Sequence, residues 1–168
     1  LVVIILLLYL NFRKISEVLI IMGTLPLALL GGYWLLYILG YNTSVAVHVG
    51  FIALAGVSVE IGVIMLVYLN QAYKRHILDK ARVHTPTIEQ LKDAVIEGAL
   101  MRVRPIMMTV AAIIAGLLPI MLGGGTGSEV MRRIAAPMVG GMVSATLLTL
   151  VVIPAVFYLM KKKQMENM

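Results

Sequence analysis

Apolar runs of membrane-spanning length recur along this 168-residue chain, and they restrict the fold more than any other feature. Hydrophobic residues make up 61% of the sequence and charged residues only 13%, far from the balance of a water-soluble domain. A helix needs about 20 apolar residues to cross a bilayer, and a spanning segment must satisfy its own backbone hydrogen bonds. The composition therefore predicts an all-α, polytopic membrane protein.

Five spanning segments are expected from these runs. The first, residues 1–12, is shorter than a full span and begins on a leucine, so we interpret it as a helix cut by the start of the sequence. It lacks the basic start and the cleavage site of a signal peptide. The other four spans are expected at 18–39, 45–69, 105–122 and 134–160. Pro105 should stand in the first turn of its span, where its missing N–H costs nothing.

The basic residues lie almost entirely between alternate spans. All but two of the 14 Lys and Arg residues fall in segment 11–17, in loop 70–104 or after residue 160. The exceptions, Arg132 and Arg133, lie on the opposite side. The positive-inside rule places loop 70–104 and the C-terminus in the cytoplasm. This distribution explains the net charge of +6 without a nucleic-acid partner.

Loop 70–104 contains one predicted helix of its own. Thr85 or Thr87 is a suitable N-cap for it. One face then carries apolar residues at helical spacing: Ile88, Leu91, Val95 and Ala99. We expect a short amphipathic helix that lies along the inner membrane surface and fixes the angle between the third and fourth spans.

Glu60 is the only acidic residue inside a membrane-length apolar stretch, with no other charge between Val45 and Asn70. A carboxylate at mid-bilayer depth costs a few kcal/mol, and a buried Glu avoids part of that cost by holding a proton. Ala53 and Gly56 share its helical face, so another helix can approach closely there. Glu60 is therefore the candidate proton carrier. The alternative is a protonated Glu that only hydrogen-bonds to a neighbouring helix.

Methionine supplies the second set of candidate residues. Met131, Met138 and Met142 recur at helical spacing around the start of the fifth span. Thioether sulfur suits soft ions such as Cu(I) and Ag(I). Methionine also fills irregular contacts between helices, and spacing alone favours that packing role.

The remaining patterns predict no catalytic or cofactor site. Segment 123–128, GGGTGS, is similar to a phosphate loop but has no following Lys and no preceding strand, so it is interpreted as a turn. His48, His76 and His84 are too far apart to predict a metal site. With no Cys and no arrangement of nucleophile and base, the chain is expected not to be an enzyme.

Three extended segments resemble the last spans of resistance-nodulation-division (RND) transporters: FIALAGVSVEIGVIMLVYL, RVRPIMMTVAAIIAGLLPIM and GSEVMRRIAAPMVGGM. The chain is most similar to the heavy-metal-efflux branch, and there to the CusA-like copper/silver exporters. The resemblance covers essentially the whole chain. It implies that the five spans are the eighth to twelfth helices of a twelve-helix permease, so that this C-terminal fragment transports nothing alone.

The resemblance also implies the location, the oligomeric state and the partner proteins of such a permease. It is a homotrimer of the bacterial inner membrane and is surrounded there by membrane lipid. It joins a periplasmic membrane-fusion adaptor and an outer-membrane channel, and proton entry drives it. No resident cofactor is implied, because the metal ion is the cargo.

Two functional residues carry over from the resemblance. It places a proton-relay Glu at Glu60 and a metal-pathway Met at Met131, whereas Met138 and Met142 remain candidates from spacing alone. The copper/silver exporters have a relay Lys directly after the Arg-Pro of the fourth span, where this chain has Ile106. This departure keeps divalent-cation export open. The sequence is also compatible with a multidrug-type exporter and with a non-transporting membrane scaffold.

Overall fold

The computed structural model describes residues 2–78 and 88–166, and nearly all of them are helical. The elements, in chain order, are α1 (Val2–Phe12), α2 (Ile15–Leu39), α3 (Val45–Tyr73), the π-helical turn η1 (Lys74–Leu78), α4 (Ile88–Leu122) and α5 (Ser128–Glu166). Helices α2 to α5 are long and apolar enough to cross a membrane, and α1 is a shorter apolar helix. The described part of the chain contains no strand. The predicted all-α fold of five apolar helices is confirmed.

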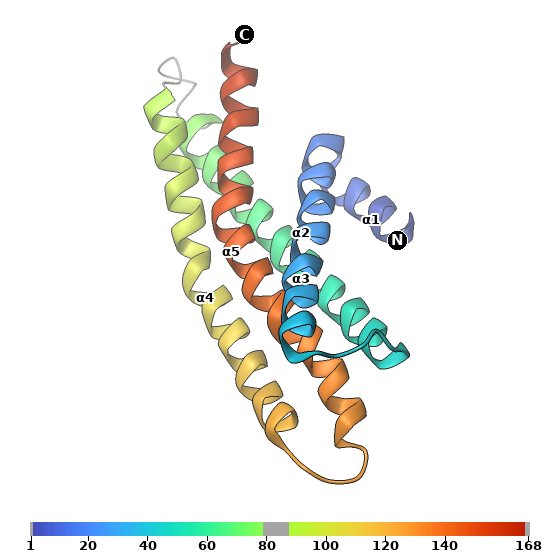
Figure 1. Cartoon of the computed structure of the whole chain (residues 1–168). Helices are drawn as coiled ribbons and strands as arrows, with labels where there is room; N and C mark the ends of the chain where they lie inside the picture. Colours follow the sequence, from blue (N-terminus) through green and yellow to red (C-terminus); the bar gives the residue numbers. More distant parts are fainter. Residues whose placement is uncertain (1, 79–87, 167–168) are drawn as a thin grey trace.

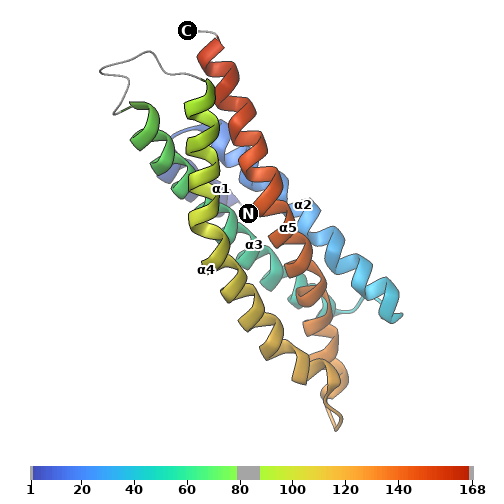
Figure 2. The ribbon, with the colours of Figure 1, turned by 90° about the vertical axis from the view of Figure 1, so that its left-hand side faces the viewer.

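Helix α5 runs through the middle of the bundle and packs against α2, α3 and α4 (Figure 1). Seen from the side, the four long helices slant in the same direction (Figure 2). Loop 40–44 and turn 123–127 lie at one end of the bundle. The α1–α2 junction, η1 and the C-terminus lie at the other, which we call the basic end because it carries most of the Lys and Arg residues.

Small residues bring the backbones of α2 and α5 into contact. A Cβ added to Gly140 would lie 2.6 Å from the carbonyl oxygen of Gly31, so no side chain fits between the two helices. Beside this crossing, Ser144 Oγ donates a hydrogen bond to the carbonyl oxygen of Ala28 at 3.1 Å. Close packing and interhelical hydrogen bonds of this kind hold helices together in a membrane, where burial of apolar surface gives little driving force.

Helix α4 differs from the two separate helices expected in its region. It is one continuous helix, and Pro105 lies in its interior rather than in its first turn. The expected surface helix is therefore wrong: Leu91 and Val95 are buried, and Gly98 packs against Leu69 and Ala72 of α3. These residues have protein to pack against instead of a membrane surface. Pro105 is tolerated because it removes only one backbone donor from a helix that α3 and α5 support.

The other helices also extend past the expected spans. Helix α2 begins at Ile15 instead of residue 18, and α3 continues to Tyr73 instead of residue 69. Polar residues continue these helices beyond the apolar runs that hydropathy detects. The expected caps Thr85 and Thr87 lie outside the described residues, as do Lys80, Arg82 and His84.

Gly140→Ala is expected to destabilise the protein, because its methyl group has no room between α2 and α5; such overpacking costs about 1–3 kcal/mol. Gly23→Ala on α2 is the matched control, since a Cβ there meets nothing within 4 Å. Alanine is also the better helix former by about 1 kcal/mol. Thermal unfolding of the protein in detergent compares the two variants, and equal melting temperatures would contradict the predicted contact.

Candidate functional site

Glu60 lies in the middle of α3 and lines a small cavity between α3 and α4. The cavity has a volume of about 140 Å³. Its wall on the α4 side includes Arg102, Pro105, Ile106 and Thr109. Most of the other lining residues are Val or Ile. Glu60 and Arg102 are therefore the two charged residues that face this cavity within the described part of the chain.

Arg102 is the site residue that sequence analysis missed. Its guanidinium carbon lies 5.0 Å from the centre of the Tyr68 ring, in a cation–π contact. Its Nε is buried and has no hydrogen-bond partner among the described residues. Arg102 lies one helical turn before Ile106 and lines the same cavity. Reading α4 at i, i+4 spacing from Ile106 would have found it.

The outer side of Glu60 is not covered by the described part of this chain. The Glu60 side chain is exposed. A Cβ added to Gly56, one turn earlier on the same face, would meet no atom within 4 Å. The predicted close approach of another helix to this small-residue face stays a prediction.

The three candidate methionines occupy different environments. Met131 is exposed and lines a shallow cavity with the glycine-rich turn before α5. Met138 is half-buried, and Met142 is fully buried in the hydrophobic core. The three sulfurs therefore do not share one exposed surface. No group of three or more His, Asp or Glu residues in the described ranges is placed to hold a metal ion.

Residues 123–127 of the glycine-rich segment connect α4 to α5 as a turn, as expected, and Ser128 begins α5. Gly125 and Gly127 adopt φ values of 135° and 85°, which side chains disfavour. Arg132 Nε donates a hydrogen bond to the carbonyl oxygen of Gly123 at 3.0 Å. The turn thus fixes the start of α5, where Met131 lies.

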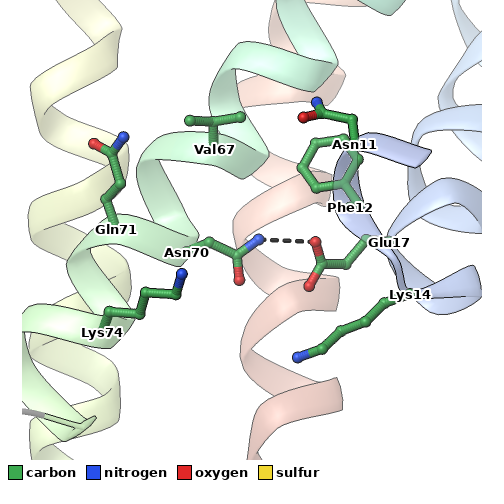
Figure 3. Close-up of a pocket in the computed structure, with 8 residues that line it drawn as sticks. All are labelled: Asn11, Phe12, Lys14, Glu17, Val67, Asn70, Gln71 and Lys74. Atoms are coloured by element: carbon green, nitrogen blue, oxygen red, sulfur yellow. Dashed lines mark hydrogen bonds between the residues drawn. The ribbon is translucent and has the colours of Figure 1, made fainter. Parts of the chain in front are cut away.

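A polar cavity of about 320 Å³ lies at the basic end, between the α1–α2 junction and the end of α3 (Figure 3). Glu17 is only 2% exposed, and its Oε2 accepts a hydrogen bond of 2.8 Å from Asn70 Nδ2. Lys14 and Lys74 also line the cavity. Glu17 precedes the expected second span, and its partner is 53 residues away, so no spacing in the sequence predicts the pair.

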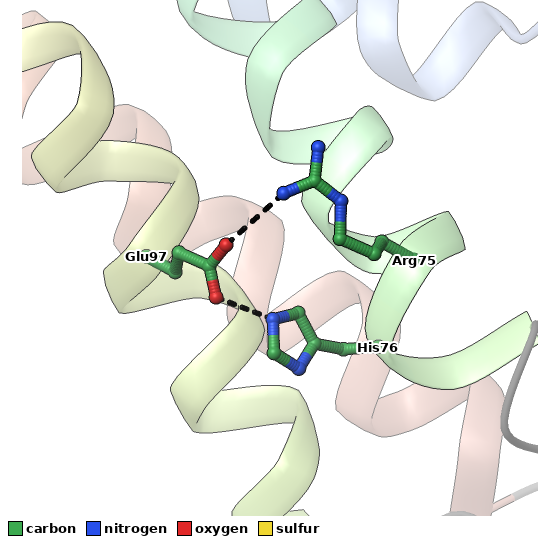
Figure 4. A network of polar contacts seen from close by, with 3 residues as sticks. All are labelled: Arg75, His76 and Glu97. Atoms are coloured by element: carbon green, nitrogen blue, oxygen red, sulfur yellow. Dashed lines mark hydrogen bonds and ion pairs between the residues drawn. The ribbon is translucent and has the colours of Figure 1, made fainter.

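An ionic cluster joins η1 to α4 (Figure 4). Arg75 Nη1 lies 3.4 Å from Glu97 Oε1, and His76 donates a hydrogen bond from Nε2 to Glu97 Oε2. The Glu97 side chain is 35% exposed. Solvent screening therefore limits what the cluster contributes to stability.

Glu97→Gln is expected to loosen η1 from α4, because a neutral Gln cannot form the ion pair with Arg75 and is a weaker hydrogen-bond acceptor for His76. The loss of stability should stay below about 1 kcal/mol for such an exposed cluster. Hydrogen exchange of residues 74–78, followed by mass spectrometry, should become faster. Asp93→Asn, exposed on the same helix, is the control that should leave this exchange unchanged. An unchanged rate in Glu97→Gln would show that the cluster does not hold η1.

Known proteins match this chain along nearly its whole length. The model of the AcrB/AcrD/AcrF family matches residues 1–161. The putative cation efflux system protein SilA of Salmonella typhimurium is 56% identical over 157 residues, which are 94% of this chain and 15% of SilA. The cation efflux system protein CusA of Escherichia coli (strain K12) is 53% identical over 160 residues, which are 95% of this chain and 15% of CusA.

A solved structure shares the helix arrangement. The X-ray crystal structure of a heavy metal efflux pump (crystal form II) matches with a TM-score of 0.78 and 36% sequence identity. The match covers 96% of this chain and 14% of that one. The chain thus spans about 15% of the length of the curated relatives it matches. Together these matches confirm the resemblance predicted from the three sequence segments.

Proposed function

Because this chain belongs to the AcrB/AcrD/AcrF family, we propose that it forms part of a proton-driven permease that exports heavy-metal cations. One observation carries the proposal: Glu60 and Arg102 face the same small cavity between two helices long enough to span a membrane. Relatives described as cation efflux proteins support the class of cargo. Since the chain spans about 15% of their length, transport requires the complete permease, and residues 1–168 alone move no cation.

In this proposal Glu60 carries the proton and Arg102 responds to it. An ionised Glu60 attracts the guanidinium of Arg102 across the cavity. The same attraction stabilises the ionised form of Glu60. A protonated Glu60 releases the guanidinium, and Arg102 then rests against the Tyr68 ring as the structure has it. The two positions of Arg102 pack α3 against α4 differently. Protonation thereby biases the permease between two access states.

The energies involved are of matching size. A charge at the centre of a bilayer costs about 2.5–3.5 kcal/mol on insertion scales. One proton that crosses a potential of about 100 mV releases about 2.3 kcal/mol. Ionisation of Glu60 across the cavity from Arg102 costs less than such an unpaired charge, because an opposite charge offsets part of the penalty. An unpaired carboxylate at the same depth would cost more than the entry of one proton supplies.

We propose Cu(I) and Ag(I) as the cargo of the complete permease. The proposal follows the resemblance to copper/silver exporters and the exposed thioether of Met131, because soft monovalent ions prefer sulfur ligands. Ile106 replaces the expected relay Lys, and Arg102 supplies a cation to the same cavity instead. The permease would be a homotrimer of the bacterial inner membrane with the basic end in the cytoplasm. It would join a periplasmic adaptor and an outer-membrane channel.

Glu60→Gln is expected to abolish metal resistance while leaving trimer assembly intact, because Gln keeps the size of the side chain but cannot release a proton. The test uses a complete permease that contains this segment, for example CusA with its matching segment replaced by residues 1–168. Growth of a metal-sensitive strain and metal uptake into inverted membrane vesicles measure the effect. Glu89→Gln, exposed in the first turn of α4, is the matched control.

Two outcomes of this experiment separate the roles of the two charged residues. Normal efflux by Glu60→Gln would refute the proton-carrying role. Arg102→Gln should also lower efflux, and Ile106→Lys in that background should restore part of it, because residue 106 faces the same cavity. If Arg102→Gln exports metal normally, Glu60 works without this cation.

Met131→Leu is expected to lower silver resistance about tenfold or more, since losing a ligand should cost at least as much as losing an outer-shell partner. Leucine keeps the apolar volume but removes the sulfur. Met108→Leu on α4, equally open to its surroundings, is the control. Resistance to Ag, Cu, Zn and Cd is measured in parallel. If Met131→Leu lost resistance to Zn and Cd but not to Ag, the cargo would be divalent cations and the proposal of Cu(I) and Ag(I) would be wrong.

A further inference from the structure

We propose that the basic end of the bundle binds the phosphate headgroup of an anionic membrane lipid, in a cavity between the start of α2 and the end of α5. The cavity measures about 440 Å³, and three lysines line it: Lys14, Lys161 and Lys163. We call it the lysine cavity. No acidic residue of the described part of the chain lines it. A group of ammonium ions without a facing carboxylate favours an anionic ligand.

Lys161 is the buried member of this group. It is only 3% exposed, although lysine is almost never fully buried unless paired. Its Nζ lies 4.5 Å from the centre of the Tyr73 ring and 5.5 Å from that of Phe157. The salt bridges among the described residues are those of Glu97, so they do not neutralise Lys161. The aromatic rings hold the ammonium group in place without cancelling its charge.

Lys14 and Lys161 share this cavity, one at the N-cap of α2 and the other near the end of α5. Glu17 lines the neighbouring cavity instead, where its Oε2 accepts the Asn70 hydrogen bond. The lysine cavity therefore collects lysine side chains from two helices, and no carboxylate of the described residues lines it. A phosphate group in this cavity would accept charge-assisted hydrogen bonds from lysines of both helices.

The first turn of α2 adds backbone donors to the same cavity. Ile15 and Ser16 begin the helix and line the lysine cavity. The first backbone N–H groups that donate to the Lys14 carbonyl are those of Glu17 and Val18. The N–H groups of Ile15 and Ser16 come before them in the helix. A helix N-terminus with unused N–H groups and a positive dipole end favours a phosphate. The lysine cavity is therefore lined by backbone donors of α2 and by lysines at the ends of α2 and α5.

The surface beside the cavity favours a lipid over free phosphate. Ile15 and Leu19 lie one turn apart on α2 and are 65% and 64% exposed, so an apolar strip leads from the cavity along the helix. The acyl chain of a lipid can cover this apolar strip, whereas inorganic phosphate makes no apolar contact with it. The basic end is also the one that the positive-inside rule assigns to the cytoplasmic leaflet, where anionic lipids attract basic segments. Basic pockets between membrane helices on that side are typical headgroup sites.

Native mass spectrometry of the complete permease, titrated with phosphatidylglycerol or phosphatidylcholine, tests the proposal without any transport assay. Phosphatidylglycerol should bind more tightly than phosphatidylcholine. Lys14→Gln and Lys163→Gln should each weaken phosphatidylglycerol binding about fivefold, the effect of about 1 kcal/mol per lysine. Lys92→Gln removes a cation from the exposed side of α4 and should bind as the unmodified protein does.

Lipid binding by Lys161→Gln is measured only if this variant elutes as a folded trimer. If it does not, the binding of Lys14→Gln and of Lys163→Gln tests the proposal. Equal binding of the two lipids would overturn the proposal, as would equal effects of Lys14→Gln and Lys92→Gln. A separate arm adds inorganic phosphate as competitor. If phosphate displaces phosphatidylglycerol at comparable concentration, the site takes free phosphate and the lipid assignment is wrong.

Discussion

The close approach of α5 to its neighbours is the contact on which the rest of the bundle depends. In a membrane, lipid is as apolar as the side chains, so helices associate through tight packing and hydrogen bonds. The Gly31–Gly140 crossing and the Ser144 hydrogen bond supply both between α2 and α5. Because α3 and α4 also pack against α5, their contacts with α5 fix the distance between them. The small cavity that holds Glu60 and Arg102 lies between these two supported helices.

The number and order of the spans followed from the sequence, because a bilayer permits few kinds of spanning segment. Each span must be helical and apolar over a known length, and the basic residues must gather at alternate ends. The boundaries were less predictable. Arg102, Arg104 and Pro105 interrupt the apolar pattern of α4 but do not end the helix, which continues through them. Hydropathy detects the apolar part of a helix and not its full length.

The candidate site was predictable only where one residue stood out by itself. Glu60 did, since it is the lone acid in an apolar span. Arg102 did not, because a cation near the edge of a span is expected to belong to a loop; its spacing from Ile106 indicates a shared helix face only once α4 is known to continue through residues 102–106. Helical spacing linked Met131 to Met142, yet burial separates them: one sulfur is exposed and the other lies in the core. Spacing describes a stripe on one helix but not what covers each part of it.

Two glutamates show why burial alone does not identify a functional acid. Glu17 is almost fully buried, and a fixed amide donor from α3 holds its carboxylate. This hydrogen bond ties the α1–α2 junction to α3. Glu60 is open on one side and faces a cation with an unused N–H on the other. A group that exchanges protons needs both access and a different partner for each charge state. Of the two, only Glu60 has an exposed side chain.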